Sequence, residues 1–258
     1  SVPLPDGRTV ALKVCALPGH EFYAKEILRI VSEALPVYSR WFGPFPYDQF
    51  TVAESFFGWN GNELSGMVLI DDRVFDMPKL AWGYVEYLVS HETCHQWWYN
   101  RVGSNGYSET FMDEGAATFF THKLMDHKFG KNNEFLKWPK ELNWLPNIQR
   151  ENYRYASVYG AIGRADMKPA AGDLPKFGHL IGLFTGAYDR GSKALELIES
   201  RLGEAAFLDF TRGVVKKYSF RVLTAADYQK ELEAYTGKPW GDFFQNWIYG
   251  KELPDWSL

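Results

Sequence analysis

Apolar residues recur at helical spacing along the first part of the chain. Between residues 21 and 42 they fall mostly three to five positions apart, the pattern of a helix buried on one side: Phe22, Ile27, Ile30, Val31, Leu35 and Tyr38. Pro44-Phe45-Pro46 ends this predicted helix. Residues 49–56 and 66–71 predict two strands, the second running from Gly66 to Ile70 before Asp71-Asp72.

The later part of the chain is mostly helical in its pattern. A long helical stretch begins at Pro78. Residues 139–176 contain several prolines, which predict an irregular segment, and we expect this segment to lie over a cleft at the functional site. Further helices are predicted at about 177–202, 204–217, 224–236 and 239–249. Three glycines stand where these helices should stop, and a capping-box-like start precedes the third: Gly203, Gly237, Gly250 and Thr224-Ala225-Ala226-Asp227. Strands followed by helices predict an α+β protein.

Composition narrows the classes of function only a little. The 258 residues are 46% hydrophobic, which is enough to bury a large core in one domain or two closely packed ones. The net charge of −4 gives no reason to expect a nucleic-acid partner. No run of 18 apolar residues exists, so we expect no membrane span. The N-terminus is polar and rich in turn residues, without the pattern of a signal peptide, and the compartment is left open.

The candidate chemistry begins with His91-Glu92-Thr93-Cys94-His95, an H-E-x-x-H motif. On a helix, His91 and His95 lie one turn apart on the same face and can bind one zinc ion. Glu92 is rotated from His91 by about 100°, so it lies beside the metal, where it can accept a proton from water. The alternative is a solvated or core helix that carries two histidines by chance. In that case the sequence need not contain a third metal ligand.

Glu114 is the candidate third ligand. A catalytic zinc site uses three protein ligands and leaves one position open. Between His95 and Glu114 the pattern runs from helix through the turn Gly103-Ser104-Asn105-Gly106 to a second helix. This helix–turn–helix arrangement lets Glu114 return to the first helix.

These residues resemble the gluzincin metallopeptidases, and specifically the M1 aminopeptidase family. His91, Glu92, His95 and Glu114 match the signature H-E-x-x-H-x18-E, and His95-Gln96-Trp97 with Asn100 matches its H-Q-W-x-x-N continuation. Two further blocks follow in the family's order, from Asp113 to Thr118 and from Ala187 to Gly191. The resemblance extends in order from about Tyr23 to Trp256.

The resemblance implies a thermolysin-like fold, with a small mixed α/β lobe, then a mainly helical lobe, and one zinc ion at their junction. It implies that His91, His95 and Glu114 bind the metal, that Glu92 acts as general base and acid, and that Tyr188 stabilises the oxyanion. Residues 1–17 are expected to end a preceding β domain or linker, and residues 18–258 to form the catalytic domain. The full-length protein is expected to carry further domains and to act on peptides.

An aminopeptidase must also bind the free α-amine of its substrate, and the resemblance gives this role to the Glu of a G-x-M-E-N motif. The matching stretch here is Asn60-Gly61-Asn62-Glu63-Leu64, in which Glu63 aligns but the leading Gly, the Met and the Asn are absent. Glu54 is the reserve candidate. Two alternatives therefore remain: a zinc hydrolase or endopeptidase without strict amine recognition, and a peptide-binding domain without catalysis.

The remaining cysteines and histidines are expected to be structural. Cys94 points away from the face of His91 and His95, which predicts a small buried apolar residue and no disulfide to Cys15. His122 and His127 are predicted to lie at the surface. His179 begins a helix before Tyr188 and is a weaker candidate for the wall of the cleft.

Overall fold

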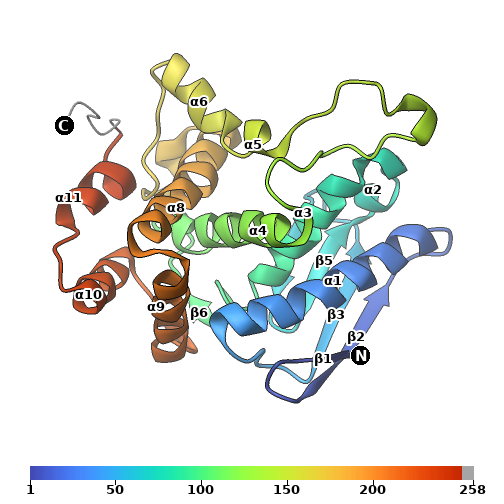
Figure 1. Cartoon of the computed structure of the whole chain (residues 1–258), viewed down its shortest axis with the longest axis horizontal. Helices are drawn as coiled ribbons and strands as arrows, with labels where there is room; N and C mark the ends of the chain where they lie inside the picture. Colours follow the sequence, from blue (N-terminus) through green and yellow to red (C-terminus); the bar gives the residue numbers. More distant parts are fainter. Residues whose placement is uncertain (252–258) are drawn as a thin grey trace. The chain divides into compact units, whose positions relative to one another are not determined.

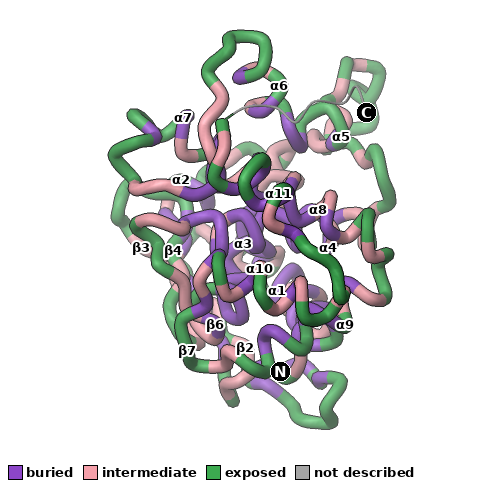
Figure 2. Tube along the Cα trace, turned by 90° about the vertical axis from the view of Figure 1, so that its left-hand side faces the viewer, coloured by how far each residue is buried: buried purple, intermediate pink, exposed green. Residues whose placement is uncertain are grey.

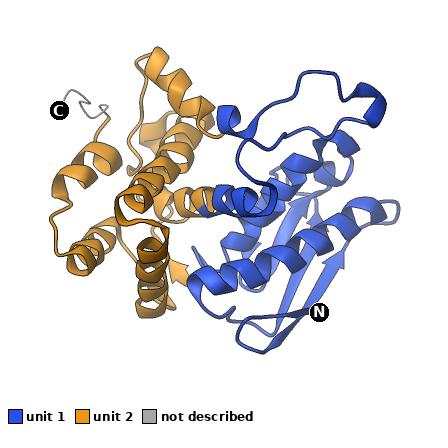
Figure 3. Ribbon diagram, in the orientation of Figure 1, with its two compact units in different colours: residues 1–100, 120–153 blue, residues 101–119, 154–258 orange. Residues whose placement is uncertain are grey.

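The structure is a computed structural model that describes residues 1–251 (Figure 1). The chain folds as two compact units, which are coloured separately in Figure 3. Unit 1 contains Ser1–Asn100 and Phe120–Tyr153. Unit 2 contains Arg101–Phe119 and the chain from Arg154 on. Helix α4 (Glu114–Phe129) therefore begins in unit 2 and ends in unit 1.

Unit 1 contains a mixed sheet and the helices that contact it. Its elements are β1 (Val2–Pro3), β2 (Thr9–Cys15), α1 (Glu21–Phe42), β3 (Gln49–Ser55), β4 (Gly61–Leu64), β5 (Met67–Asp71), α2 (Asp72–Phe75), a 3₁₀ turn (Lys79–Ala81), α3 (Trp82–Cys94), the second part of α4, a 3₁₀ turn (Lys140–Leu142) and α5 (Arg150–Tyr153). The five strands run in the order β1-β2-β3-β5-β4. The inner pairs are parallel, whereas β1 and β4 pair antiparallel at the two edges.

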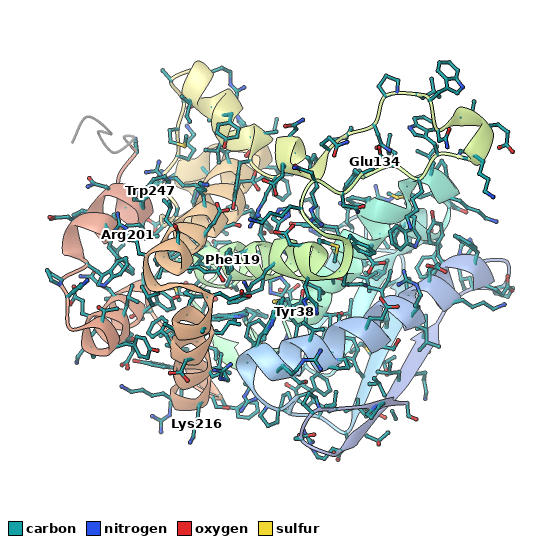
Figure 4. All side chains as sticks on the ribbon, in the orientation of Figure 1. Tyr38, Phe119, Glu134, Arg201, Lys216 and Trp247 are labelled. Atoms are coloured by element: carbon teal, nitrogen blue, oxygen red, sulfur yellow. The ribbon has the colours of Figure 1, made fainter. Side chains whose placement is uncertain are left out.

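Helices α1 and α3 pack against each other, α1 also contacts β2, and α3 contacts β4 and β5. The buried side of α1 follows the helical period, and Ile27, Ile30 and Leu35 are completely buried. Tyr38 of α1, labelled in Figure 4, donates a hydrogen bond to the Ser90 carbonyl oxygen at 3.2 Å. Figure 2 shows α3 as one of the most buried parts of the chain. The sequence of α3 is therefore held inside the unit and not on its surface.

Unit 2 is mainly helical. Its elements are β6 (Val102–Gly103), a 3₁₀ turn (Thr110–Met112), the first part of α4, α6 (Ala156–Gly163), a 3₁₀ turn (Leu174–Phe177), α7 (Leu180–Leu183), a π-helix (Phe184–Arg190), α8 (Gly191–Leu202), α9 (Glu204–Lys217), β7 (Arg221–Val222), α10 (Ala225–Thr236), α11 (Gly241–Phe244) and a π-helix (Gln245–Tyr249). Strands β6 and β7 pair in parallel.

Most predicted elements are present with nearly the predicted bounds. Helix α1 covers 21–42, β3 and β5 match the two predicted strands, and α9 matches 204–217. The capping box at the start of α10 is confirmed, because Thr224 accepts from the Asp227 backbone and Asp227 accepts from the Thr224 backbone. Two predicted helices begin later, at Leu180 and Gly241, and each continues through a π-helix.

The prediction of an α+β protein is confirmed, although its two parts are not consecutive in sequence. Residues 120–153 return to unit 1, so the mixed unit is not complete before the helical one begins. The predicted irregular segment 139–176 contains the short helices α5 and α6. Strand β2 pairs with β3 within unit 1, and the assignment of residues 1–17 to a preceding domain stays a prediction. Within residues 1–251, no helix has both the length and the apolar character needed to cross a bilayer.

Candidate metal centre

His91 and His95 occupy the buried end of α3. His91 is 6% exposed and His95 is 1% exposed. His95 keeps helical backbone angles just after the last residue of α3, so the two rings still lie one turn apart. Their Nε2 atoms are 3.2 Å from each other. The motif thus brings two imidazole nitrogens to one point inside unit 1.

The hydrogen bonding of His95 fits a metal ligand. Its Nδ1 atom lies 2.9 Å from the carbonyl oxygen of Trp98, which can only accept a hydrogen bond. Nδ1 must therefore carry the proton, which leaves Nε2 of the neutral ring as an electron-pair donor. A tetrahedral zinc ion about 2.0–2.1 Å from two imidazole nitrogens holds them roughly 3.3 Å apart. The observed separation of 3.2 Å fits that geometry.

Two carboxylates converge on the same place in unit 1. Ligand atoms of Glu63, Glu92 and His95 all lie within 4.8 Å of one another. Glu92 is 6% exposed on α3, and Glu63 is half-buried on the edge strand β4. The structure therefore brings the candidate general base and the candidate amine-binding carboxylate together beside one of the histidines.

The alternation of β4 explains why the altered motif still presents Glu63. Successive side chains of a strand point to opposite faces. Gly61 is buried and Glu63 is half-buried on one face, whereas Asn62 and Leu64 are exposed on the other. The positions that lack the family's Met and Asn are therefore on the exposed face, away from Glu92.

Two residues of the H-Q-W-x-x-N block attach the β4–β5 turn to the end of α3. The side-chain amide of Gln96 donates to the Leu64 carbonyl oxygen at 2.9 Å and accepts from the Gly66 N–H at 2.8 Å. Asn100 accepts from the Ser65 hydroxyl at 3.0 Å and donates to the His95 carbonyl oxygen at 3.1 Å. Sequence reasoning assigned no role to Gln96 or Asn100, although their place in this block was the signal that could have identified them.

Tyr84 is a further polar residue near this cluster that sequence reasoning missed. It lies on α3 eight residues before Glu92, about 80° from it around the helix axis. Burial, and after it the neighbouring Tyr153 and Glu92, raise the pKa of Tyr84 to about 12, although a hydrogen bond with Asn60 opposes the rise. Tyr84 is therefore a neutral phenol at physiological pH.

Glu114 is the first residue of α4 and belongs to unit 2, whereas the two histidines belong to unit 1. It is half-buried. Asp113 just before it is buried, accepts from the Glu114 N–H at 2.6 Å and is hydrogen-bonded by the Ser104 hydroxyl. A carboxylate that accepts an N–H bond at a helix start stabilises the first turn. Asp113 therefore fixes the backbone that carries Glu114.

The turn that carries Tyr188 packs directly on the first turn of α4, within unit 2. An ideal Cβ added to Gly115 would lie 2.9 Å from the Ala187 carbonyl oxygen and 3.2 Å from the Gly191 Cα. Tyr188 lies in the π-helix Phe184–Arg190, and its ring makes an edge contact with Phe184 at 4.8 Å between centroids. A π-helix in this position is consistent with a functional site, where such turns are frequent.

The residue after Tyr188 is a carboxylate in a poorly solvated place. Burial raises the pKa of Asp189 to about 6, and a hydrogen bond from the Ser157 hydroxyl of α6 opposes that rise. Arg190 is completely buried and donates to backbone carbonyl oxygens of unit 2. The two residues attach the π-helix to different neighbours, and neither role was predicted from the sequence.

The other sequence candidates are placed as follows. Cys94 is buried, as predicted, whereas Cys15 is exposed, and both cysteines are free. The prediction that His122 lies at the surface is wrong: it is 2% exposed and its ring packs on Tyr87, because α4 is buried on more than one side. Glu54 accepts from the Leu17 N–H and interacts with His20, both at 2.7 Å. His179 is exposed and caps α7 through its Nδ1 atom.

A helix with two facing imidazoles beside two carboxylates is typical of metal-dependent hydrolases, and this is the class of protein that the site indicates. The sequence model of the Peptidase family M1 domain matches residues 27–247. The chain therefore belongs to peptidase family M1.

Individual relatives agree with this family. The chain is 23% identical over 254 residues to "Probable aminopeptidase 2" of Sulfurisphaera tokodaii, covering 93% of this chain and 30% of that protein. It is 28% identical over 139 residues to human "Aminopeptidase Q", covering 53% of this chain and 13% of that protein. The chain thus spans less than a third of the length of these curated relatives.

Solved structures share the fold. A two-domain M1 zinc metallopeptidase bound to L-arginine superposes with a TM-score of 0.70 at 21% identity, covering 98% of this chain and 51% of that one. Legionella pneumophila aminopeptidase A, in complex with aspartic acid, gives a TM-score of 0.73 at 15% identity, covering 96% of this chain and 27% of that one. At these identities the similarity establishes the fold alone.

Proposed function

We propose that this chain is the catalytic domain of a zinc aminopeptidase that releases N-terminal residues from peptides. The observation that carries the proposal is the 3.2 Å separation of the His91 and His95 Nε2 atoms next to the Glu92 and Glu63 carboxylates. Membership of family M1 and the aminopeptidase names of its relatives support the same activity.

His91, His95 and Glu114 are proposed as the three ligands of one zinc ion. His91 and His95 offer facing nitrogens, and Glu114 stands at the matching place of the family signature. Helix α4, which begins with Glu114, is uninterrupted, and its Phe120 stacks on Trp98 at 5.8 Å between centroids. When bound, zinc supplies polarisation of the scissile carbonyl and lowers the pKa of the attacking water.

Glu92 is proposed to move the proton. Its carboxylate accepts a proton from the attacking water and later delivers it to the leaving amine. The Tyr188 hydroxyl donates a hydrogen bond to the oxygen that gains negative charge as the tetrahedral intermediate forms. A neutral tyrosine suits this role, because its O–H is a donor at neutral pH.

Glu63 is proposed to bind the α-ammonium group of the substrate. A carboxylate forms short, charge-assisted hydrogen bonds to an ammonium group. Because Glu63 lies within 4.8 Å of Glu92 and His95, it can hold the substrate's N-terminus one residue from the scissile bond. Binding of the α-ammonium group by Glu63 would restrict cleavage to the N-terminal residue and make the enzyme an exopeptidase.

The decisive experiment compares wild type, Glu92→Gln and Glu63→Ala on an aminoacyl-4-nitroanilide, with metal content measured on each protein. Glu92→Gln should lose about 10²-fold or more in kcat while retaining zinc, since it removes general-base catalysis. Glu63→Ala should lose its preference for free amines over N-blocked substrates. The exposed Glu151 of α5 provides the matched control, and Glu151→Gln should keep the wild-type rate. Near-wild-type turnover by Glu92→Gln would reject the mechanism.

One observation favours a second candidate, an endopeptidase or other hydrolase without strict amine recognition. Asn62 and Leu64 stand where the family motif has its Met and Asn. Cleavage of N-blocked peptides, with none of free-amine substrates, would support this candidate. Metal analysis that finds no zinc after purification without chelator would instead support a peptide-binding domain.

A further inference from the structure

The ring of Tyr87 lies against His91, the first histidine of the motif. The two rings are stacked, with 5.9 Å between their centroids and 24° between their planes. The contact follows from the helix, because Tyr87 precedes His91 by four residues and a helical side chain leans toward the N-terminus of its helix. Toward the other end of α3, the His91 ring makes an edge contact with His95, with centroids 4.8 Å apart. The imidazole of His91 is therefore held between two rings of its own helix.

The Tyr87 ring also packs on His122 of α4, within unit 1. His122 is 2% exposed, and its ring centroid lies 5.2 Å from that of Tyr87. Both residues line a cavity between α3 and α4, whose wall also includes Glu86 and Met125. A side chain beside a cavity lacks contacts on that side and has room to rotate. The contact with His122 therefore helps to keep the Tyr87 ring against His91.

The ring orientation of His91 decides where its nitrogen points. In His95, the hydrogen bond from Nδ1 to the Trp98 carbonyl oxygen at 2.9 Å fixes that orientation. In His91, a rotation of the ring about its Cβ–Cγ bond would move Nε2 away from the Nε2 atom of His95, which now lies 3.2 Å away. A ring stacked on His91 opposes this rotation, because the turning imidazole would collide with it.

We propose that Tyr87 is a positioning residue for His91, and that His122 holds Tyr87 in this position. The inference rests on the proposed binding of zinc by His91 and His95. It gives a role to a buried histidine that is not among the proposed ligands. The ring of Tyr87 supplies the contact with His91, so its phenolic hydroxyl is not required for this role.

The first test measures zinc affinity by competition with a chromogenic chelator, starting from the zinc-loaded protein. Tyr87→Leu should weaken zinc binding about 10-fold, because groups that orient a metal ligand affect affinity on this scale. Tyr87→Phe keeps the ring and should retain the wild-type affinity. Wild-type affinity in Tyr87→Leu would overturn the proposal, as would equal losses in Tyr87→Leu and Tyr87→Phe.

Phe129→Leu is the matched control. Phe129 is a half-buried aromatic residue of α4, and its ring packs on Trp82 of α3 with 5.6 Å between centroids. Tyr87→Leu and Phe129→Leu each remove a ring contact between α3 and α4, so the Tm of the zinc-free protein should fall in both. Zinc affinity should fall in Tyr87→Leu alone. An equal loss of affinity in Phe129→Leu would show that looser packing of the two helices is the cause, and would overturn the proposal.

The support from His122 is tested by a double-mutant cycle. His122→Leu should weaken zinc binding several-fold in the wild-type background. It should have little further effect when residue 87 is already Leu, because its influence on His91 passes through the Tyr87 ring. Equal fold-losses in the two backgrounds would overturn the role of His122.

The outcomes separate this proposal from the proposed function. If His91→Gln binds zinc as tightly as wild type, the proposed metal site is wrong. If His91→Gln loses zinc but Tyr87→Leu does not, the metal site stands and only the positioning role is rejected. If Tyr87→Leu does not fold, Tyr87→Met, a flexible side chain without a ring, replaces it in the competition assay. If neither variant folds while Tyr87→Phe does, the ring is needed for folding and the positioning proposal is rejected.

Discussion

Gly115 and Gly191 lie against each other with no room for a side chain on either. A Cβ on Gly115 would lie 2.9 Å from the Ala187 carbonyl oxygen and 3.2 Å from the Gly191 Cα. A Cβ on Gly191 would lie 2.9 Å from the Phe111 Cβ and 3.4 Å from the Gly115 Cα. Each glycine closely follows a candidate site residue. Gly115 comes directly after Glu114, and Gly191 comes three residues after Tyr188. The close approach therefore holds Glu114 and Tyr188 on adjacent backbones of unit 2.

Substitution of either glycine should disturb this packing, because a methyl group on Gly115 would press on the Ala187 carbonyl oxygen and one on Gly191 would press on the Phe111 side chain. We expect Gly191→Ala to lower the free energy of unfolding by about 1–3 kcal/mol, the usual effect of overpacking a filled interior. Its kcat should fall as well, because Tyr188 moves with the π-helix. Urea unfolding and steady-state kinetics would measure both. Gly213→Ala is the control, because a Cβ on Gly213 of α9 would meet nothing within 4 Å. This control should leave the free energy of unfolding unchanged or raise it, and a Gly191→Ala protein as stable as the control would contradict the packing argument.

Gln96 should be needed for presenting Glu63. Gln96→Ala removes a donor to the Leu64 carbonyl oxygen and an acceptor for the Gly66 N–H. We expect a loss of about 1–3 kcal/mol in the free energy of unfolding, because both backbone groups lose their partner. KM for free-amine substrates should rise several-fold while zinc content stays unchanged, since His95 is retained.

Gln49 offers the control for this prediction, because it is an exposed glutamine on β3. Gln49→Ala should leave both the urea midpoint and KM near the wild-type values. If Gln96→Ala behaved like Gln49→Ala, the hydrogen bonds from Gln96 to the β4–β5 turn would have no measurable role in substrate binding.

Removing the metal should destabilise the fold. A ligand that binds only the folded state adds about 4 kcal/mol at a thousand times its Kd. We expect a chelator to lower Tm by several degrees and added zinc to restore it. His91→Gln should abolish this zinc-dependent shift, whereas His127→Gln, at an exposed position, should keep it. A chelator without effect on Tm would contradict a zinc ion bound by buried ligands.

Local patterns predicted much of this fold because they determine local structure. The apolar period of residues 21–42, the glycine after α9 and the capping box at Thr224 are each decided within a few residues. The facing histidines follow in the same way, because helical spacing alone places His91 and His95 on one side of α3.

Features that depend on distant residues were less predictable. Strand β2 gains its partners from β3, more than 30 residues later, and its alternation alone is short and partly exposed. The burial of His122 depends on α4 being covered on several sides, which its spacing from His127 does not reveal. The Gln96 attachment likewise depends on a turn 30 residues earlier in the chain.

Asp189 should make stability depend on pH. Its pKa is raised from 3.8 to about 6 by burial, so the folded state holds a proton that the unfolded state releases. The contribution of Asp189 to the free energy of unfolding is therefore greatest below about pH 4. It falls by about 1–3 kcal/mol as the pH rises to 6.

Comparison with Asp189→Asn isolates this effect, because Asn cannot ionise but can still accept the Ser157 hydrogen bond. We expect the difference in Tm between Asp189→Asn and wild type to grow between pH 4 and pH 6 and to stay constant above pH 7. The fully exposed Asp48 is the control, and Asp48→Asn should show no such growth. A flat difference across this range for Asp189→Asn would show that the carboxylate is well solvated.

Arg190 should be among the most sensitive positions of unit 2. Its guanidinium donates to the carbonyl oxygens of Asn246 at 2.6 Å, Trp247 and Lys168 at 3.1 Å, and Lys251 at 3.3 Å. Figure 4 labels Trp247 in this part of the chain, and its ring lies 5.9 Å from the guanidinium carbon. Burial lowers the pKa of Arg190 to about 10, so the side chain is still charged at neutral pH.

Arg190→Met would leave these carbonyl oxygens without their buried donor, and we expect it to lower the free energy of unfolding by about 3–5 kcal/mol. Arg190→Lys should fall between Met and wild type, since one compact ammonium cannot reach all the oxygens that a planar guanidinium spans. Arg212→Met is the control, because Arg212 is exposed and its ion pair with Asp209 is worth less than about 1 kcal/mol. The urea midpoint should therefore be highest and similar for wild type and Arg212→Met, lower for Arg190→Lys and lowest for Arg190→Met. The same order in kcat would follow from the attachment of the π-helix that carries Tyr188, whereas an Arg190→Met protein with the wild-type midpoint would contradict it.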